Sequence, residues 1–240
     1  MKFNNYNLTL KDDVAVFTKQ LFYALFDDVC QEKAHRLKNQ FISILKGLSV
    51  EKPEYIWSYY QNSFCDIRKK LDLDAQAFEN TDPACKSLGE VYLAYPGFHA
   101  IAIHRLSHEL YKMKVPILPR MMSEYGHGLT GVDIHPGAVI GDAFFIDHAT
   151  GVVIGETTII ENNVSIYQGV TLGGIQVAKE LAEVKRHPTI KSNVTIYANA
   201  TILGDVTIGE NSIIGANVCI TQSIEPNSKV IYKSQNSIYT

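Results

Sequence analysis

Two histidines stand beside charged residues at places where an otherwise regular sequence is interrupted. His148 follows Asp147 in the segment Asp147-His148-Ala149-Thr150-Gly151, and His187 follows Arg186 in Arg186-His187-Pro188. An imidazole exchanges a proton near neutral pH, and a neighbouring charge orients it for general acid–base chemistry. A surface loop that merely accepts polar residues is the simpler reading of either interruption alone. Two such interruptions, each with a histidine, favour a functional site.

The pattern that these segments interrupt is a six-residue repeat of isoleucine or leucine. A small or β-branched residue usually stands two positions before each repeated residue. Such a repeat predicts a solenoid in which three repeats close one triangular coil and the large residues stack inside it, with about four to five coils in all. A β-sandwich would have less regular turn spacing. The repeated residues are Ile134, Ile140, Ile146, Ile154, Ile160, Ile166, Leu172, Ile190, Ile196, Ile202, Ile208, Ile214 and Ile220.

Coil arithmetic, the counting of residues along the repeat from one coil to the next, places an acidic residue near the first histidine. Asp133 directly precedes the interior Ile134, and one coil later the chain passes through His148. The two residues should therefore occupy adjacent layers at the same corner, where a carboxylate would fix the tautomer of the imidazole and stabilise its protonated form. Because the pattern forces no serine or cysteine to their side, we expect the pair to deprotonate a bound substrate.

The half of the chain before the repeat has helical periodicity. Apolar residues recur at helical spacing from Leu10 to about Gly126, and a long helix is expected from Gly97 to Met113. Turn-forming segments interrupt this half at Lys52-Pro53, residues 80–83, residues 95–97 and Val115-Pro116. The expected fold class is α+β, with an α-helical domain in residues 1–127, the repeat domain in residues 128–226 and a tail in residues 227–240.

Composition narrows the function classes. The chain has 240 residues, 46% of them hydrophobic, and a formal net charge of −3, so no global basic field favours nucleic acid or an anionic membrane. Neither a signal peptide nor an apolar run of about 20 residues is evident, and we expect a cytoplasmic protein. The four cysteines form no CxxC pair, which is typical of reduced thiols.

Several motifs, taken together and in order, resemble the serine acetyltransferase family. The resemblance covers roughly residues 78–227 and includes the helical half as well as the repeat. A hexapeptide repeat alone is common to many acyltransferases, whereas this ordered set is more specific. The motifs are Asp82-Pro83-Ala84, Tyr95-Pro96-Gly97-Phe98-His99-Ala100, Gly131-Val132-Asp133-Ile134-His135-Pro136-Gly137, Phe145 to Thr157, Gly169-Val170-Thr171-Leu172-Gly173-Gly174 and Lys185-Arg186-His187-Pro188-Thr189-Ile190.

The resemblance implies a fold, an assembly and an activity. The fold would be a left-handed parallel β-helix, an exception to the usual right-handed crossover. The assembly would be a homotrimer or a dimer of trimers with active sites between subunits. The activity would transfer an acetyl group from acetyl-CoA to the hydroxyl of L-serine, giving O-acetyl-L-serine for cysteine biosynthesis. No permanently bound cofactor is implied, and L-cysteine would be a feedback inhibitor at the serine site.

The same resemblance implies the catalytic roles. His148 would be the general base for the serine hydroxyl, with Asp133 as its partner. His187 would come from the facing subunit and would bind the substrate or stabilise the tetrahedral oxyanion. Attack would be direct, with general-base help worth about 10²- to 10⁴-fold.

Substrate-binding roles also follow from the resemblance. Arg186, from the facing subunit, would bind the serine carboxylate through two charge-assisted hydrogen bonds. Asp82 and Asp147 would bind the ammonium group, and Glu156 would line the pocket.

Coenzyme A would be held by residues on the coils and in the tail. Backbone amides of Gly173 and Gly174 would hold the acyl group, and Ala198, Ala216 and Lys233 would contact the cofactor. The chain departs from the family here, because Tyr197-Ala198-Asn199 and Gly215-Ala216-Asn217 replace glycine-rich hexads. Lys191 and Lys229 join Lys233 as candidate phosphate partners. The chain ends Ser237-Ile238-Tyr239-Thr240, which does not favour the family's complex with O-acetylserine sulfhydrylase, since that partner captures a C-terminal isoleucine.

Three other function classes remain open at this point. A hexapeptide-repeat acetyltransferase for a sugar or an antibiotic would keep the prism and the base but would not need Asp82-Pro83. A trimeric β-helix zinc enzyme of the carbonic anhydrase type would use His135, His148 and His187 between subunits. A catalytically silent oligomerisation module would lack cofactor binding. His104 and His108 have the spacing of a metal-binding pair, but no completing ligand accompanies them, and no metal site is expected.

Overall fold

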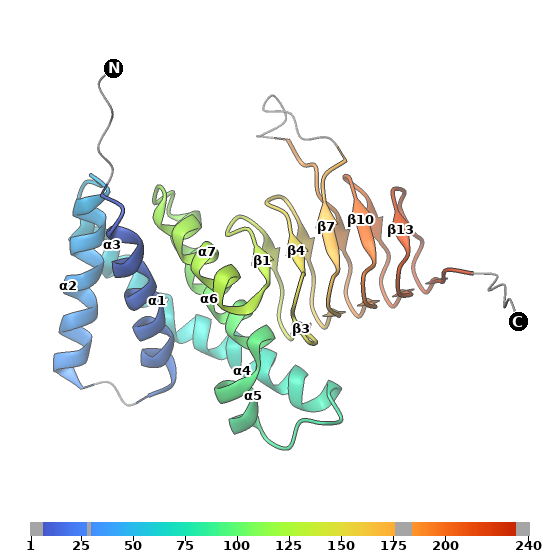
Figure 1. The fold of residues 1–240 in the computed structure, drawn as a ribbon, viewed down its shortest axis with the longest axis horizontal. Helices are drawn as coiled ribbons and strands as arrows, with labels where there is room; N and C mark the ends of the chain where they lie inside the picture. The colour runs from blue at the N-terminus through green and yellow to red at the C-terminus, as the bar shows by residue number, and fades with distance from the viewer. Residues whose placement is uncertain (1–6, 28–29, 176–183, 234–240) are drawn as a thin grey trace, which may run out of the picture.

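The chain folds into an N-terminal group of helices that leads into a coil of short parallel strands (Figure 1). The computed structural model describes residues 7–27, 30–175 and 184–233. The helices are α1 (Leu10–Phe26), α2 (Gln31–Gly47), α3 (Pro53–Asn62), α4 (Phe64–Thr81), α5 (Leu88–Ala94), α6 (Pro96–Lys112) and α7 (Leu118–Thr130). The strands are β1 (Asp133–Ile134), β2 (Val139–Ile140), β3 (Phe145–Ile146), β4 (Val153–Ile154), β5 (Ile159–Ile160), β6 (Ser165–Ile166), β7 (Thr171–Gly173), β8 (Thr189–Ile190), β9 (Thr195–Ile196), β10 (Thr201–Leu203), β11 (Thr207–Ile208), β12 (Ile213–Ile214), β13 (Cys219–Ile220) and β14 (Lys229–Val230).

The helices begin and end where the turn-forming segments predict. α3 begins at Pro53 and α6 at Pro96, positions where the missing proline N–H costs no helical hydrogen bond. Asp82 is the C-terminal cap of α4, so the predicted boundary at Asp82-Pro83 is confirmed. α6 is the most buried helix element and matches the long helix expected from Gly97 to Met113. No helix in the described part of the chain is long and apolar enough to cross a membrane.

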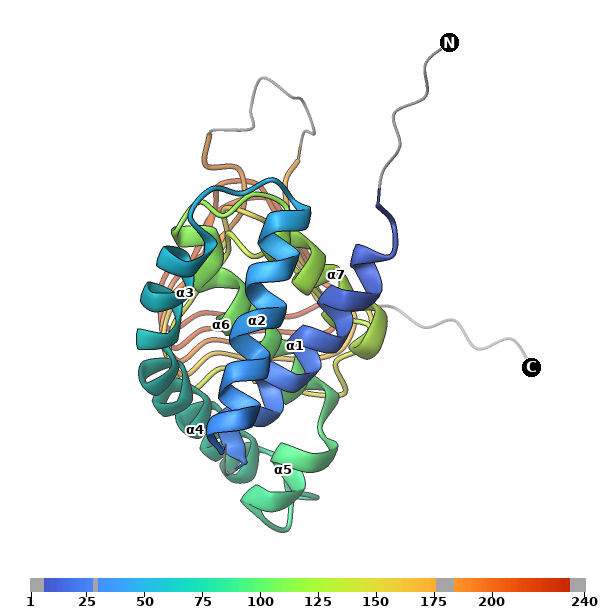
Figure 2. The same ribbon diagram turned by 90° about the vertical axis from the view of Figure 1, so that its left-hand side faces the viewer.

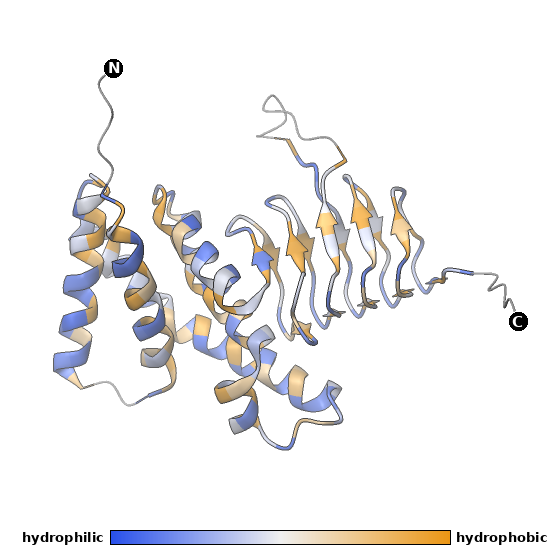
Figure 3. Cartoon of the chain, in the orientation of Figure 1, coloured by the Kyte–Doolittle hydropathy of each residue, from blue (hydrophilic) through white to orange (hydrophobic). Residues whose placement is uncertain are grey.

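The six-residue repeat builds three parallel sheets that share one interior. Their strand orders are β1-β4-β7-β10-β13, β2-β5-β8-β11 and β3-β6-β9-β12-β14. The repeated residues are register partners, as in Ile134 to Ile154 and Ile140 to Ile160, and each is at most 6% exposed. Figure 3 shows the hydrophobic colour along several of these strands. The predicted columns of isoleucine are confirmed. Burial of each such side chain stabilises the fold by about 1.5–3 kcal/mol relative to leaving it exposed.

Three corners join these sheets, and two of them carry the candidate chemistry. The His148 corner comprises residues 147–152, 167–170, 197–200 and 215–218, which connect the sheet of β3 to the sheet of β1. The His187 corner comprises residues 135–138, 155–158, 184–188 and 204–206, which connect the sheet of β1 to the sheet of β2. The two histidines of one chain therefore lie at different corners of the same prism.

A buried ion pair fastens the helices to the first coil. Arg105 on α6 donates to both carboxylate oxygens of Asp74 on α4, at 2.6 and 2.7 Å. The same guanidinium donates to the carbonyl oxygens of Ile140 and Gly141, and Asp74 also accepts from the N–H of Phe144. Both side chains are at most 5% exposed. Because every charge has hydrogen-bond partners, the pair can fix the position of α4 against the coil.

The element bounds differ slightly from the expected division of the chain. α7 continues to Thr130, and β14 pairs with β12 at residues 229–230. Figure 2 shows α1 and α2 lying across the end of the coil, with α6 and α7 between them and the strands. The helices of the described residues thus cover the first turns of the coil and leave its later flanks uncovered.

Candidate active site

An ionised carboxylate marks the point where the helices meet the His148 corner. Asp82 accepts hydrogen bonds from the hydroxyl of Tyr95 at 2.6 Å and from the N–H of Ala84 at 2.8 Å. These bonds lower the pKa of Asp82, with the Tyr95 hydroxyl as the largest cause, and nearby His148 lowers it further. In return, the Asp82 carboxylate raises the pKa of Tyr95. Asp82 therefore presents a stable negative charge within electrostatic reach of His148.

His148 lies on a tight, strained turn with its side chain exposed. His148 and Ala149 adopt left-handed backbone conformations, with φ of 57° and 68°, which are uncommon for residues other than glycine. The N–H of His148 donates to the Asp147 carboxylate at 2.9 Å, and the imidazole Nε2 lies 3.7 Å from the other oxygen of that carboxylate. The His148 side chain is 68% exposed. The turn thus holds the imidazole outside the coil beside one carboxylate.

Asp133 lies one strand away from this turn. Its backbone N–H donates to the carbonyl oxygen of Val152, and its register partner is Val153. Within the described residues, no hydrogen bond or ion pair joins Asp133 to His148, and the carboxylate within ion-pair distance is that of Asp147. The N–H of Gly151 donates to the carbonyl oxygen of Gly131, so the turn that carries His148 lies in the layer next to the residues that precede Asp133.

His187, at the other corner, is locked in one tautomer by Thr157. The Thr157 hydroxyl oxygen accepts from the N–H groups of Arg186 and His187, at 3.0 and 3.1 Å. Its hydrogen is then free to donate to Nδ1 of His187 at 2.9 Å, and the N–H of Thr157 donates to the same nitrogen at 3.1 Å. Since Nδ1 accepts two hydrogen bonds, the neutral ring carries its proton on Nε2.

The environment keeps the His187 ring neutral. The pKa of His187 is lowered to about 4. Burial is the largest cause of this shift, and the nearby cations of Arg186 and Lys185 lower the pKa further. The residue is only 9% exposed. A neutral imidazole with a fixed Nε2–H is a hydrogen-bond donor, suited to an oxyanion or a carbonyl oxygen.

Gly155 provides the space for this ring. A Cβ atom at Gly155 would lie 2.2 Å from Nε2 and 2.1 Å from Cδ2 of His187. No side chain larger than a hydrogen fits there unless the imidazole moves. The glycine is thus a requirement of the close packing of His187.

Glu156 and Arg186 form an ion pair at the same corner. Nη2 of Arg186 donates to Oε2 of Glu156, and the Tyr111 hydroxyl donates to Oε1 at 2.9 Å. Burial acts to raise the pKa of Glu156, but the hydrogen bonds from Arg186 and Tyr111 outweigh it and hold the pKa below its ordinary value. The carboxylate therefore stays ionised and orients the guanidinium.

The residues predicted to hold coenzyme A divide between the same two corners. Ala198 and Ala216 lie at the His148 corner, where Asn199 and Asn217 take left-handed conformations with φ of 59°. Asparagine tolerates this region better than most residues, so the corner keeps its shape without glycine. Gly173 ends β7 and Gly174 follows it towards the His187 corner, and Lys233 is exposed beyond β14. Residues 237–240, at the end of the chain, lie outside the described residues.

Metal ligands do not gather in the part of the chain that the structure describes. No group of three or more His, Cys, Asp or Glu residues there could hold a metal ion within one chain. The rings of His104 and His108 on α6 lie 5.4 Å apart between centroids and are tilted by 33°, and Nδ1 of His108 donates to the carbonyl oxygen of Pro136. Because a carbonyl oxygen can only accept, His108 carries a proton on Nδ1 and donates it to the backbone of the first coil.

Four residues of the site carried no predicted role: Gly155, Thr157, Tyr95 and Tyr111. Gly155 and Thr157 lie within the repeat, and its register could have predicted their neighbours, because Ile160 and Ile190 are register partners thirty residues apart. The same offset places Glu156-Thr157 against Arg186-His187. Tyr95 joins α5 to α6 and Tyr111 lies on α6, and their contacts with Asp82 and Glu156 depend on tertiary packing that no periodicity reveals.

The hexad coil, its helical cap and the pair of histidine corners define a transferase of the hexapeptide-repeat class. A family model described as bacterial transferase hexapeptide (six repeats) matches residues 187–222, and one described as serine acetyltransferase, N-terminal, matches residues 34–102. The structure of serine acetyltransferase isoform 3 from Entamoeba histolytica in complex with cysteine is 34% identical, with a TM-score of 0.83 over 100% of this chain and 86% of that chain. The chain belongs to the serine acetyltransferase family, and its coil is the left-handed parallel β-helix expected for that family.

Two further comparisons agree with this placement. Serine acetyltransferase from Bacillus subtilis (strain 168) is 52% identical over 122 residues, which cover 51% of this chain and 54% of that protein. The aligned stretch thus spans about half the length of the curated relative. Serine acetyltransferase from Brucella abortus strain S19 in complex with coenzyme A is 32% identical, with a TM-score of 0.66 over 93% of this chain and 80% of that chain.

Proposed function

We propose that this protein is a serine O-acetyltransferase, an acyltransferase that moves the acetyl group of acetyl-CoA to the hydroxyl of L-serine and forms O-acetyl-L-serine for cysteine biosynthesis. The observation that carries the proposal is the complementarity of the two corners. One corner offers an exposed imidazole beside the Asp147 carboxylate and within electrostatic reach of Asp82, and the other offers a guanidinium beside a neutral imidazole donor. Together they match the charges of an amino acid and the polarity of its acylation.

In this proposal the acceptor is held at both of its charged groups. Asp82 and Asp147 bind the ammonium of L-serine, and the low pKa of Asp82 supports its role as an anion. Arg186 of a second copy binds the carboxylate, oriented by its ion pair with Glu156. These contacts would turn the serine hydroxyl towards His148.

The acyl transfer then needs one proton to move twice. Nε2 of His148 takes the proton of the serine hydroxyl while that oxygen attacks the thioester carbonyl carbon, so a C–O bond forms. The tetrahedral oxyanion accepts a hydrogen bond from Nε2–H of His187, supplied by the second copy. When the C–S bond breaks, His148 returns the proton to the departing sulfur. Asp147 and Asp133 favour the imidazolium between these steps, and general-base help contributes about 10²- to 10⁴-fold.

Acetyl-CoA serves as a substrate, and no permanently bound cofactor is needed for this chemistry. Its pantetheine and nucleotide portions would lie along the His148 corner past Ala198 and Ala216 towards Lys233, with Gly173 and Gly174 of the facing copy near the acyl group. L-cysteine has the charged groups of L-serine, so it would compete for the same site as a feedback inhibitor. The cysteine and coenzyme A complexes of the two related proteins support both assignments.

The proposal requires an oligomer, because each chain supplies half of two different sites. A homotrimer with a closed threefold axis would bring the His148 corner of one copy against the His187 corner of the next. Pairing of two trimers through the helices would give a hexamer. The proposed location is the cytoplasm.

The deciding experiment measures thiol release from acetyl-CoA by the purified protein. L-serine should support release, whereas sugars, amines and D-serine should not. O-acetyl-L-serine should form in equal amount, as measured by mass spectrometry. Release with a sugar but not with serine would mean that the acceptor is a sugar. Release that needs added zinc would favour the metal-dependent class.

A further inference from the structure

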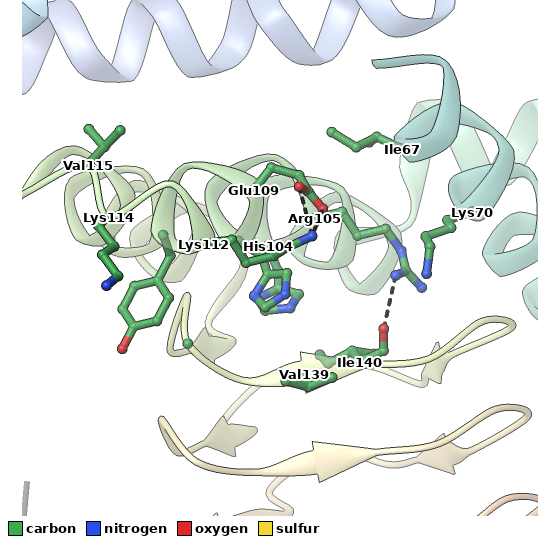
Figure 4. A pocket seen from close by; sticks show the side chains of 13 residues that line it. Ile67, Lys70, His104, Arg105, Glu109, Lys112, Lys114, Val115, Val139 and Ile140 are labelled. Carbon is green, nitrogen blue, oxygen red and sulfur yellow. Dashed lines mark hydrogen bonds and ion pairs between the residues drawn. The ribbon is translucent and has the colours of Figure 1, made fainter. Parts of the chain in front are cut away.

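A large cavity lies between the helices and the first coil, away from the two histidines of the proposed site. It has a volume of about 860 Å³, within the range of small-molecule sites. α6 forms one wall, and β2 faces it across the cavity, with α4 at one end (Figure 4). The apolar part of the lining consists of Ile67, Val115, Val139 and Ile140.

One residue that lines the cavity has a buried polar atom without a partner among the described residues. His104, on the cavity side of α6, is only 3% exposed, and its Nδ1 forms no hydrogen bond within the described residues. Buried polar groups are normally hydrogen-bonded, so an orphaned one calls for an explanation. His108 lies one helical turn further on and uses its Nδ1–H for the carbonyl of Pro136, which leaves Nε2 for other partners.

The charged lining is mainly basic. Four basic side chains and one carboxylate line the cavity: Lys70, Arg105, Lys112, Lys114 and Glu109. Arg105 and Lys70 are paired with Asp74 and Asp142, and Lys112 is paired with Glu109. The Lys114 side chain has no ion pair or hydrogen bond to any described residue. It is exposed and follows the end of α6, in a left-handed conformation with φ of 57°.

We propose that this cavity is a second ligand site, which binds a small organic anion with an apolar body. The anionic group would lie near Lys114 and the basic rim, the apolar body would lie against Val115, Val139 and Ile140, and the ligand or a water molecule beside it would satisfy His104. An apolar wall with a few convergent polar groups is the usual composition of such a site. The volume far exceeds that of an inorganic anion and leaves room for an organic body.

Calorimetric titration of the purified protein tests this site with benzoate, hexanoate and phenyl phosphate as probes. L-serine is present at saturation so that its own site is filled, and acetyl-CoA is left out. The anions should bind saturably, and benzyl alcohol and benzylamine should not. Because turnover plays no part, the result is independent of the proposed activity.

Two pairs of variants locate the bound anion. Lys114→Asn should weaken binding about tenfold, the loss of roughly one charge-assisted hydrogen bond. Lys52→Asn is its matched control, since Lys52 is also exposed and left-handed, with φ of 53°, but lies outside the cavity. Val139→Phe should abolish binding by filling the cavity, whereas Val153→Phe, at the equivalent outward position of β4, should not.

The outcomes separate clearly. Loss of binding in Lys114→Asn and Val139→Phe, with both controls unchanged, supports the site. Equal binding to Val139→Phe and the wild type overturns it, as does tight binding of the alcohol or the amine. Benzoate binding that is seen without L-serine but disappears when L-serine is saturating also overturns it, because the anion would then occupy the acceptor site.

Discussion

The two histidine corners of one chain differ in almost every physical respect. His148 is 68% exposed on a strained turn and has a single carboxylate within ion-pair distance. His187 is 9% exposed, packed on Gly155 and held by three hydrogen bonds that Thr157 makes to the ring and its own backbone. The first corner presents a group free to exchange a proton, and the second presents a fixed donor. In the proposed oligomer, a second copy would cover the exposed base and complete its surroundings.

The largest effect is expected from removing the exposed base. His148→Ala should lower serine-dependent thiol release by about 10²- to 10⁴-fold, the usual worth of a general base. The melting temperature should hardly change, because an exposed turn residue contributes few core contacts. A stable His148→Ala protein with near-normal release would remove the proposed mechanism. Asp147→Asn, which keeps the shape of the neighbour, should give a smaller loss.

Co-expression of two inactive variants tests whether the corners act in pairs across chains. His148→Ala and His187→Asn subunits, with different affinity tags, are each expected to be almost inactive alone. In randomly mixed rings about a quarter of the sites combine an intact His148 with an intact His187, so about a quarter of wild-type activity should return. Mixed oligomers that stay inactive would mean that both corners serve one site within a chain, contrary to the comparison.

The sequence predicted the corners better than the contacts within them. The spacing of the isoleucines identified the interior, the parallel register and the two places where the coil is interrupted, because each depends on local periodicity. It did not identify the Thr157 lock, although the thirty-residue offset between Ile160 and Ile190 was available to do so. It could not identify the Tyr95 bond to Asp82, or the Arg105 clamp on Asp74, since these join helices at positions that no repeat relates.

The expected partnership of Asp133 and His148 shows the limit of coil arithmetic. The arithmetic estimates the layer of a residue, and the structure places Asp133 in β1, beside Val153 of the adjacent layer, while His148 lies on the turn that precedes β4. The direction of a side chain on a bulged turn depends on the left-handed conformations of His148 and Ala149, which the periodic pattern does not predict. Whether Asp133 acts on His148 stays a prediction, and comparison of Asp133→Asn with Asp147→Asn in the thiol-release assay would rank the two carboxylates.

A single methyl group should disturb the fixed corner. In Gly155→Ala the new Cβ would lie 2.2 Å from Nε2 of His187, so the imidazole must move. Displacement of a donor by about 1 Å costs up to about 10²-fold in rate, and kcat should fall more than the KM for serine rises. Gly128→Ala is the matched control, since nothing lies within 4 Å of a Cβ there. Normal kinetics in Gly155→Ala would argue that the position of His187 is unimportant.

The smallest effect is the pH dependence of stability that the buried histidine should impose. Its pKa falls from an ordinary value of 6.5 in the unfolded chain to about 4 in the fold. Between these values the unfolded chain binds the extra proton, so this contribution to stability is fully present above pH 6.5 and is lost as the pH falls towards 4. Other buried histidines act in the same direction, and His187→Asn isolates one of them, because its free energy of unfolding should fall less steeply than that of the wild type over this interval. Parallel urea-unfolding curves for the two proteins from pH 7 to pH 4 measure the difference. Equal slopes would mean that His187 is accessible to protons in the fold, and the contrast between a free base and a locked donor would then fail at the second corner.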